Sequence, residues 1–234
     1  YGKLQKKIRG AQRDIKDLKT VGVIETIPDK GIKKIAKPVG VIGAIVPCTN
    51  PEATPFIKAM FALKARNAVV FSPHPRSKKT NFFIVSIMRD VLKKYDAPED
   101  LLISVQEPTI DISNEVMKQC DLVIATGGSA LVKAAYSSGK PAYGVGVGNA
   151  VVIVDETCDI KDAANKIMLS KTFDFATSCS AENSLVVHDS VYDELLEALQ
   201  SEGGYLVPRE EKTQLQNAMW PDGEHLSAKI VGQE

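Results

Sequence analysis

The chain has 234 residues with 29 basic and 29 acidic side chains, so its formal net charge is zero. Basic residues gather only in short clusters at 33–37 and 76–79, and neither nucleic acid nor an anionic membrane is favoured as a partner. The cysteines, Cys48, Cys120, Cys158 and Cys179, are widely spaced, which predicts no metal site and no disulfide framework. A cytoplasmic, reducing location fits this pattern best.

No apolar run approaches the roughly 18 residues of a membrane span, and no charged-then-apolar leader stands at the N-terminus. An amphipathic helix is predicted at once, over residues 3–20, and a strand is expected over 228–231 at the other end. We therefore expect further sequence before Tyr1 and a second domain that continues beyond Glu234.

Strands and helices alternate through the rest of the chain. The apolar run at 39–46 predicts a strand covered on both faces, as in a parallel sheet. Further strands are expected at 68–71, 101–105, 122–125, 142–147, 150–154 and 184–188. Helices are expected at 54–66, with Thr54 as cap, and at 81–95, 113–119, 129–137, 160–173, 191–199 and 210–219. This order indicates an α/β fold with a doubly wound, mostly parallel, Rossmann-like sheet.

Ligands of such sheets bind beyond the carboxyl ends of the strands. One segment there, residues 126–129 (TGGS), follows a strand and opens a helix, so its free N–H groups and helix dipole could hold a phosphate; an ordinary glycine turn is the alternative. Residues 144–149 (GVGVGN) fail as a dinucleotide fingerprint because Asn149 stands where the last glycine is needed.

Two other residues at this edge are candidates for chemistry. Asn50, on the loop between Pro47 and Pro51, carries an amide that could donate to an oxyanion, although a turn asparagine before proline is the alternative. His74, between two prolines at the end of a strand, could contact a cofactor.

Cys179 lies among small and hydroxyl-bearing residues in the stretch SKTFDFATSCSAENSLVV. A cysteine on a turn between a helix and a strand, with little bulk beside it, is placed for a small electrophile to reach, so it is a candidate nucleophile. The alternative is a small buried hydrophobe, as most free cysteines are. We expect the other three cysteines only to pack.

Several segments together resemble the CoA-acylating branch of the aldehyde dehydrogenase superfamily. They are PVGVIGAIVPCTNP, FSPHPRSK, ATGGSALVKAAYSSGKPAYGVGVGN, SKTFDF with the cysteine loop after it, and AKIVGQ. They follow one order over nearly the whole chain, so the resemblance is more specific than any single motif. It implies a dinucleotide-binding domain over 1–155, the start of a catalytic domain over 156–234, and a homo-oligomer at full length.

The resemblance also implies how the residues act. Cys179 would attack an aldehyde as thiolate, while Asn50 and the Cys179 backbone N–H would hold the oxyanion. NAD, with NADP as an alternative, would be the cofactor and CoA the co-substrate. The cofactor-binding residues implied are Pro47, Thr49, Ser72, His74, Thr126, Gly127, Gly128, Ser129, Gly144 and Gly146.

The hydrolytic branch activates water with a glutamate in a Glu-Leu-Gly-Gly-Lys segment, whereas the matching residues 145–149 (VGVGN) hold no carboxylate. A thioester on Cys179 would then survive for a thiol to take. Hydroxyls at Thr177, Ser178 and Ser180 could donate to an anionic substituent, which leaves sulfoacetaldehyde and acetaldehyde, or another short aldehyde, as competing substrates.

Two hypotheses that assign the chain to other functional classes remain. One is a nucleotide-binding or assembly module without turnover. The other is a cysteine hydrolase, which needs a base paired with Cys179, and no histidine stands in a plausible relation to it in the sequence.

Overall fold

The computed structural model describes residues 2–146, 148–227 and 229–230. Contacts within the chain group it into two units, residues 1–147 and 148–234, which are described separately. The division precedes the boundary expected after residue 155, because strand β8 (Ala150–Val154) pairs with β9 (Glu182–Val187) of the second unit.

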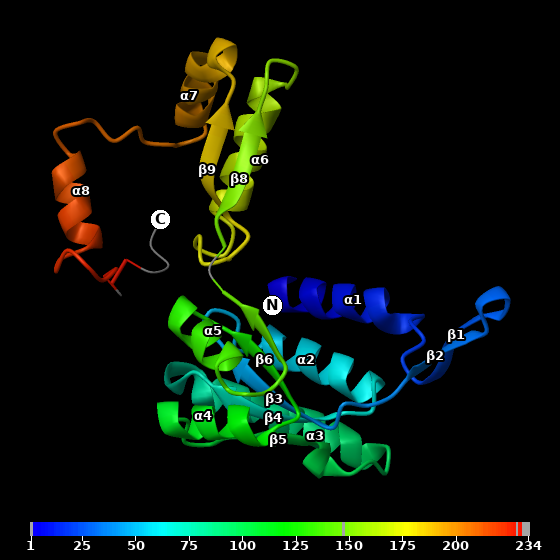
Figure 1. The fold of residues 1–234 in the computed structure, drawn as a ribbon. Helices are drawn as coiled ribbons and strands as arrows, with labels where there is room; N and C mark the ends of the chain where they lie inside the picture. The colour runs from blue at the N-terminus through cyan, green and yellow to red at the C-terminus, as the bar shows by residue number, and fades with distance from the viewer. Residues whose placement is uncertain (1, 147, 228, 231–234) are drawn as a thin grey trace. The chain divides into compact units, whose positions relative to one another are not determined.

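The first unit is built on a five-stranded parallel sheet (Figure 1). Its strand order is β5-β4-β3-β6-β7, so the chain moves outward from β3 in one direction and then returns to its other side. The bounds are β3 Val41–Val46, β4 Ala68–Pro73, β5 Leu102–Ser104, β6 Leu122–Thr126 and β7 Ala142–Val145. The predicted α/β class and doubly wound parallel sheet are confirmed.

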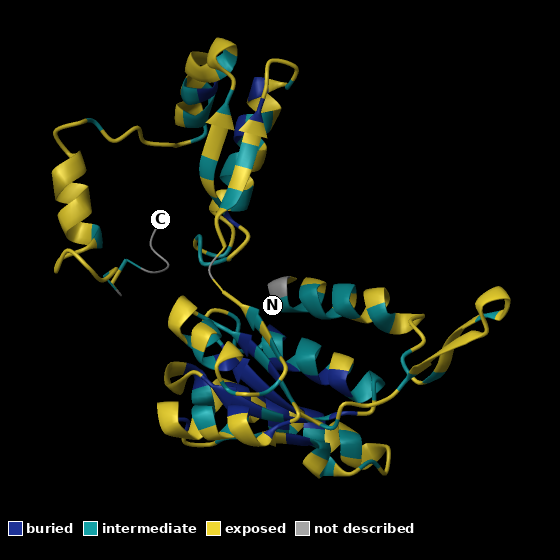
Figure 2. Ribbon diagram, in the orientation of Figure 1, coloured by how far each residue is buried: buried dark blue, intermediate teal, exposed yellow. Residues whose placement is uncertain are grey.

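Helices cover both faces of this sheet, as the unbroken apolar run of β3 predicts. Ile42, Ala44 and Val46 of β3 pack with helices on one face, and Ile45 packs with helices on the other. Figure 2 shows the buried residues concentrated in the sheet and the helix surfaces that face it. The helices are α2 Ala53–Lys64 and α3 Lys78–Lys94 on the first face, and α4 Ile110–Gln119 and α5 Ser129–Tyr136 on the second.

Helix α1 (Gly2–Lys16) packs against α2, and its apolar stripe is half-buried there. An antiparallel hairpin of β1 (Gly22–Ile27) and β2 (Ile32–Ala36) follows. The sequence reading missed it because most of its residues are exposed, so neither strand shows a buried, alternating face. Helix α2 begins at Ala53, so the expectation that Thr54 caps it is wrong.

The second unit pairs β8 with β9 in parallel and packs α6 (Ile160–Lys171) and α7 (Tyr192–Ser201) on them. Helix α8 (Lys212–Met219) follows. The strand expected at 228–231 falls partly outside the described residues, and Lys229 and Ile230 are not in a strand. Among the described residues, no helix has the length and apolar character needed to cross a membrane.

Candidate active site

The carboxyl ends of the sheet strands bring most of the predicted site residues of the first unit to one edge. The register pairs Ile45 of β3 with Ser72 of β4 on one side and with Ala125 of β6 on the other. Strand order reverses between β3 and β6, which is the place where doubly wound sheets bind ligands. The loops that start at Pro47, His74 and Gly127 therefore leave the sheet side by side.

Backbone hydrogen bonds continue the ladder into these loops. The His74 N–H donates to the carbonyl of Val46 over 2.9 Å, and the Gly127 N–H donates to Val145 over 3.0 Å. The exposed His74 ring accepts at Nδ1 from the Arg76 N–H over 3.2 Å, so the neutral ring carries its proton on Nε2. That leaves one outward donor at the sheet edge, where the sequence predicted a cofactor contact.

Asn50 is held by a side chain that was not among the site residues predicted from the sequence. Lys7 of α1 donates from Nζ to Oδ1 of Asn50 over 2.8 Å. Because a lysine ammonium has donors only, the amide atom that faces it must be the oxygen. The NH2 group of Asn50 is thereby turned away from Lys7, as an oxyanion donor requires.

Lys58 of α2 lies below the same edge. Its Nζ donates over 2.9 Å to the carbonyls of Ile45 in β3 and Ile124 in β6, so it bridges the two strands at the switch point. Burial lowers the pKa of Lys58 to about 7. A neutral amine has two N–H donors, which satisfy both carbonyls, and its lone pair remains free. The sequence did contain one sign of this buried lysine, because Lys58 is a charged residue inside the apolar run PFIKAMF.

The Thr126–Ser129 turn joins β6 to α5 with an uncapped helix N-terminus. Gly128 is the cap residue and has no side chain to bond the first amides of α5, and no other side chain among the described residues does so. A Cβ at Gly128 would meet nothing within 4 Å, whereas one at Gly127 would come within 2.6 Å of Leu131. The turn therefore combines free N–H groups with open space, as the phosphate interpretation requires.

Two other predicted cofactor residues have packing roles in this structure. Ser72 is fully buried, and its hydroxyl lies 2.9 Å from that of Ser113 in α4. A Cβ at Gly144 would come within 2.7 Å of Val132 in α5, so the close packing of β7 and α5 accounts for that glycine. Gly146 and Thr49 are exposed, and Pro47 is half-buried.

In the second unit, Cys179 is exposed on a tight turn. The Ala181 N–H donates to the Ser178 carbonyl over 3.1 Å, which places Cys179 at the first corner of a β-turn. Asp174, Phe175 and Ala176, just before it, have φ values of 60°, 54° and 53°. Left-handed backbone costs a non-glycine residue roughly 1–2 kcal/mol. The approach to Cys179 is therefore strained, which is common at functional sites.

The hydroxyls beside Cys179 differ in what they have left to donate. Thr177 Oγ1 donates to the Asp174 carbonyl over 2.7 Å and to its Oδ2 over 2.9 Å. Ser178 and Ser180 face each other with their oxygens 2.9 Å apart and are hydrogen-bonded as a pair. Only one proton is used between them, so this pair keeps a donor for a bound group, whereas Thr177 is fully engaged.

Gly148, in the segment without a carboxylate, lies next to the cysteine turn. A Cβ on Gly148 would come within 3.0 Å of the Cys179 carbonyl oxygen, and Asn183 Nδ2 is 3.5 Å from the Gly148 oxygen. Glu182 is the carboxylate next along the turn. Its Oε2 is buried and has no hydrogen-bond partner among the described residues.

The other cysteines are less suited to attack an electrophile. Burial raises the pKa of the Cys120 thiol, and Cys158 packs against the core of the second unit. Cys48 is exposed, so the expectation that it only packs is wrong. It leaves the sheet on the loop of Asn50, which makes it a useful control for Cys179.

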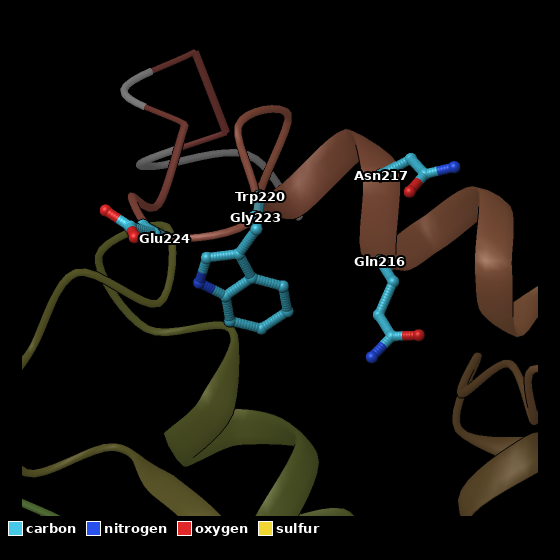
Figure 3. Close-up of a pocket in the computed structure, with 5 residues that line it drawn as sticks. All are labelled: Gln216, Asn217, Trp220, Gly223 and Glu224. Carbon is cyan, nitrogen blue, oxygen red and sulfur yellow. The ribbon is translucent and has the colours of Figure 1, made fainter.

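A hollow of about 430 Å³ lies elsewhere in the second unit, lined by α8 and the segment that follows it. Figure 3 shows the Trp220 ring between Gln216 and Glu224 at its wall. None of its lining residues was predicted as a site residue, and it contains neither a cysteine nor a histidine.

A model of the aldehyde dehydrogenase family matches residues 4–214. A sulfoacetaldehyde dehydrogenase of Acholeplasma sp is 51% identical over 218 residues, which are 93% of this chain and 45% of that protein. An acetylating aldehyde dehydrogenase from Geobacillus thermoglucosidasius has a TM-score of 0.90 at 43% identity, covering 95% of this chain and 50% of the other. A Rhodopseudomonas palustris propionaldehyde dehydrogenase with bound propionyl-CoA has a TM-score of 0.79 at 38% identity, covering 84% of this chain and 44% of the other.

The chain thus spans about half the length of the relatives it matches. The predicted family is confirmed by a match over residues 4–214, a range that contains β3, the Thr126–Ser129 turn and the Cys179 turn. This chain belongs to the aldehyde dehydrogenase family.

Proposed function

We propose that the protein containing this chain is a CoA-acylating aldehyde dehydrogenase, which converts a short aldehyde, CoA and NAD(P)+ into acyl-CoA, NAD(P)H and a proton. The observation that carries the proposal is the exposed Cys179 at the corner of a tight turn, beside a glycine segment without a carboxylate. A thiol in this position is reachable, and no base in that segment favours water over a second thiol.

In the first step the Cys179 sulfur, as thiolate, attacks the aldehyde carbon. The new C–S bond pushes the carbonyl π electrons onto oxygen, and the Cys179 backbone N–H and the Asn50 NH2 group donate to that oxyanion. The Lys7 contact supports this assignment for Asn50, because it leaves the amide nitrogen free to donate.

The sheet edge fits a dinucleotide. The uncapped N-terminus of α5, the open space over Gly128 and the outward His74 Nε2 would hold its phosphates and ribose. When bound, a nicotinamide would accept the hydride that leaves the carbon attached to Cys179. Ser72 and Gly144 are not needed for this proposal. NAD is favoured and NADP is the alternative. Lys78 is paired with Glu107, but the exposed Arg76 has no ion pair among the described residues and could hold the 2′-phosphate of NADP.

Loss of the hydride leaves an acyl thioester on Cys179. The CoA thiolate then attacks the acyl carbon, and the Cys179 thiolate departs, so that the enzyme is regenerated and acyl-CoA is released. The acetylating relative and the propionyl-CoA bound to the Rhodopseudomonas enzyme support this acceptor.

For the aldehyde we propose sulfoacetaldehyde, with acetaldehyde as the competing substrate. The Ser178–Ser180 pair keeps a donor that could face a sulfonate, and the Acholeplasma relative is named for sulfoacetaldehyde. A strong preference of the protein for acetaldehyde in kcat/KM would contradict the sulfonate choice.

The test uses this chain in its full-length context and follows NAD(P)H formation with aldehyde, with and without CoA. We expect Cys179→Ala to lose on the order of 10⁴-fold or more in kcat, since the nucleophile is gone. Cys48→Ala removes the other exposed cysteine and should stay near wild type. Activity of Cys179→Ala with water alone would refute both the nucleophile and the acceptor, and NAD(P) binding without turnover in the wild type would favour a nucleotide-binding module.

A further inference from the structure

Lys7 occupies an unusual position on α1. The apolar stripe that packs against α2 contains Leu4, Ile8, Ala11 and Ile15, and Lys7 lies on the same half-buried face. Restricting a lysine there costs side-chain entropy of up to roughly 2 kcal/mol, and an apolar residue would serve the packing better. We therefore expect the lysine at this position to be explained by a polar interaction that its ammonium group makes.

Helix α1 is held in register along α2 by contacts independent of Lys7. Lys64 at the end of α2 donates from Nζ to the Lys16 carbonyl over 3.0 Å, and Thr20 donates to the Lys64 carbonyl over 2.8 Å. These bonds lie at the opposite end of α2 from Asn50. The Lys7–Asn50 bond is thus not needed to dock α1 and can act on the asparagine.

The bond has two consequences for the Asn50 amide. It selects one of the two amide orientations, the one with oxygen toward Lys7 and NH2 away from it. The positive charge of the Lys7 ammonium beside the amide oxygen also draws electron density from the amide nitrogen, which makes its N–H groups stronger donors. Both effects favour a preorganised oxyanion site.

We propose that Lys7 is a positioning residue, which orients and polarises Asn50 for the oxyanion-donor role that the proposed function gives to this asparagine. This inference rests on the proposed function. It adds a residue from the first helix of the chain to the groups that support Asn50.

The experiment measures kcat and KM in the full-length protein for Lys7→Met, Lys7→Arg, Asn50→Ala and the double variant. Lys6→Met changes the exposed neighbouring lysine and serves as the matched control. Rates of Cys179 alkylation by iodoacetamide and thermal midpoints report on the intact thiol and fold.

We expect Asn50→Ala to lower kcat on the order of 100-fold, the cost of an oxyanion donor. Lys7→Met should lower kcat roughly 10-fold through misorientation of the amide, with KM for CoA, alkylation rate and thermal midpoint close to those of Lys6→Met. Lys7→Arg should recover most of the loss, since arginine also only donates.

The double variant tests whether Lys7 affects kcat through Asn50. If Lys7 acts through Asn50, adding Lys7→Met to Asn50→Ala causes no further loss, because the group to be oriented is absent. An additive loss, or a Lys7→Met variant as active as Lys6→Met, overturns the role of Lys7 while the proposed function stands. An unchanged kcat in Asn50→Ala, by contrast, overturns the Asn50 assignment itself.

Discussion

The sheet edge of the first unit and the cysteine turn of the second are built in different ways. At the edge, Pro47, His74 and Gly127 follow strands whose register and backbone bonds determine their positions, over a buried core. In the turn, residues 174–181 are held by local hydroxyl and backbone bonds and by left-handed backbone. The groups that we propose to orient and bind thus lie directly after rigid strands, and the group that we propose to react lies on a strained, exposed turn.

This difference predicts how each region responds to change. Groups at the edge are coupled to the fold, so perturbing them alters global stability or binding. Groups in the turn are coupled mainly to one another, so changes there should be small in stability and visible in chemistry.

The largest effect is expected from Lys58→Met, in the pH dependence of stability. The unfolded chain keeps the Lys58 proton up to its ordinary pKa of 10.5, whereas the folded chain releases it near pH 7. Between these values the unfolded state binds more protons, so stability rises with pH by about 1.4 kcal/mol per unit from this group. Between pH 7.5 and 9.5, the free energy of unfolding measured with urea should rise by about 3 kcal/mol more in wild type than in Lys58→Met.

Lys79→Met provides the control, because Lys79 is exposed and the chemical change is the same. The methionine at 58 also leaves the Ile45 and Ile124 carbonyls without their donor, so absolute stability falls at every pH. Only the slope against pH reports on the titration. Parallel curves for Lys58→Met and wild type would contradict the lowered pKa.

The sheet and its edge could be predicted from sequence because the pattern there is local. The run at 41–46 is apolar without alternation, and small or polar loops follow the strands. The same reading placed Ser72 and Gly144 at the edge although their side-chain positions face helices α4 and α5. Successive side chains of a strand point to opposite faces of the sheet, so a shift of one residue changes which side chains at a strand end can face a ligand. The sequence did not show the position of the strand end to within one residue.

Side-chain contacts between elements far apart in the sequence could not be predicted in the same way. Lys7 and Lys58 reach Asn50 and two strands across 43, 13 and 66 residues of chain. The sequence offers only the signal that each charge interrupts an apolar helix face. The β1–β2 hairpin is largely exposed, so its sequence shows no pattern of buried residues. The strain before Cys179 depends on φ angles that Asp, Phe and Ala rarely adopt, so the sequence did not indicate it.

An intermediate effect is expected from Gly128→Asp at the edge. A carboxylate at the cap of α5 would repel a phosphate while satisfying the helix amides itself. Titration of NAD(P) should give a Kd at least roughly 10-fold higher, about 1.4 kcal/mol, with stability changed by only a few tenths of a kcal/mol. Gly128→Asn has nearly the same shape without the charge and should weaken binding less. Equal losses in the two variants would indicate that bulk, and not charge, matters at Gly128.

The smallest effect is expected from Ala176→Gly in the cysteine turn, with Ala163→Gly in α6 as its control. Glycine relieves the left-handed strain at 176, which outweighs its greater loss of entropy, so the free energy of unfolding should rise by roughly 0.5–1 kcal/mol. The same substitution in the helix should lower it by about 1 kcal/mol. Chemical unfolding of the two variants measures both. A stabilised Ala176→Gly with reduced kcat would show that the strained backbone positions Cys179, whereas a destabilised one would place the left-handed segment among the elements that the fold itself requires.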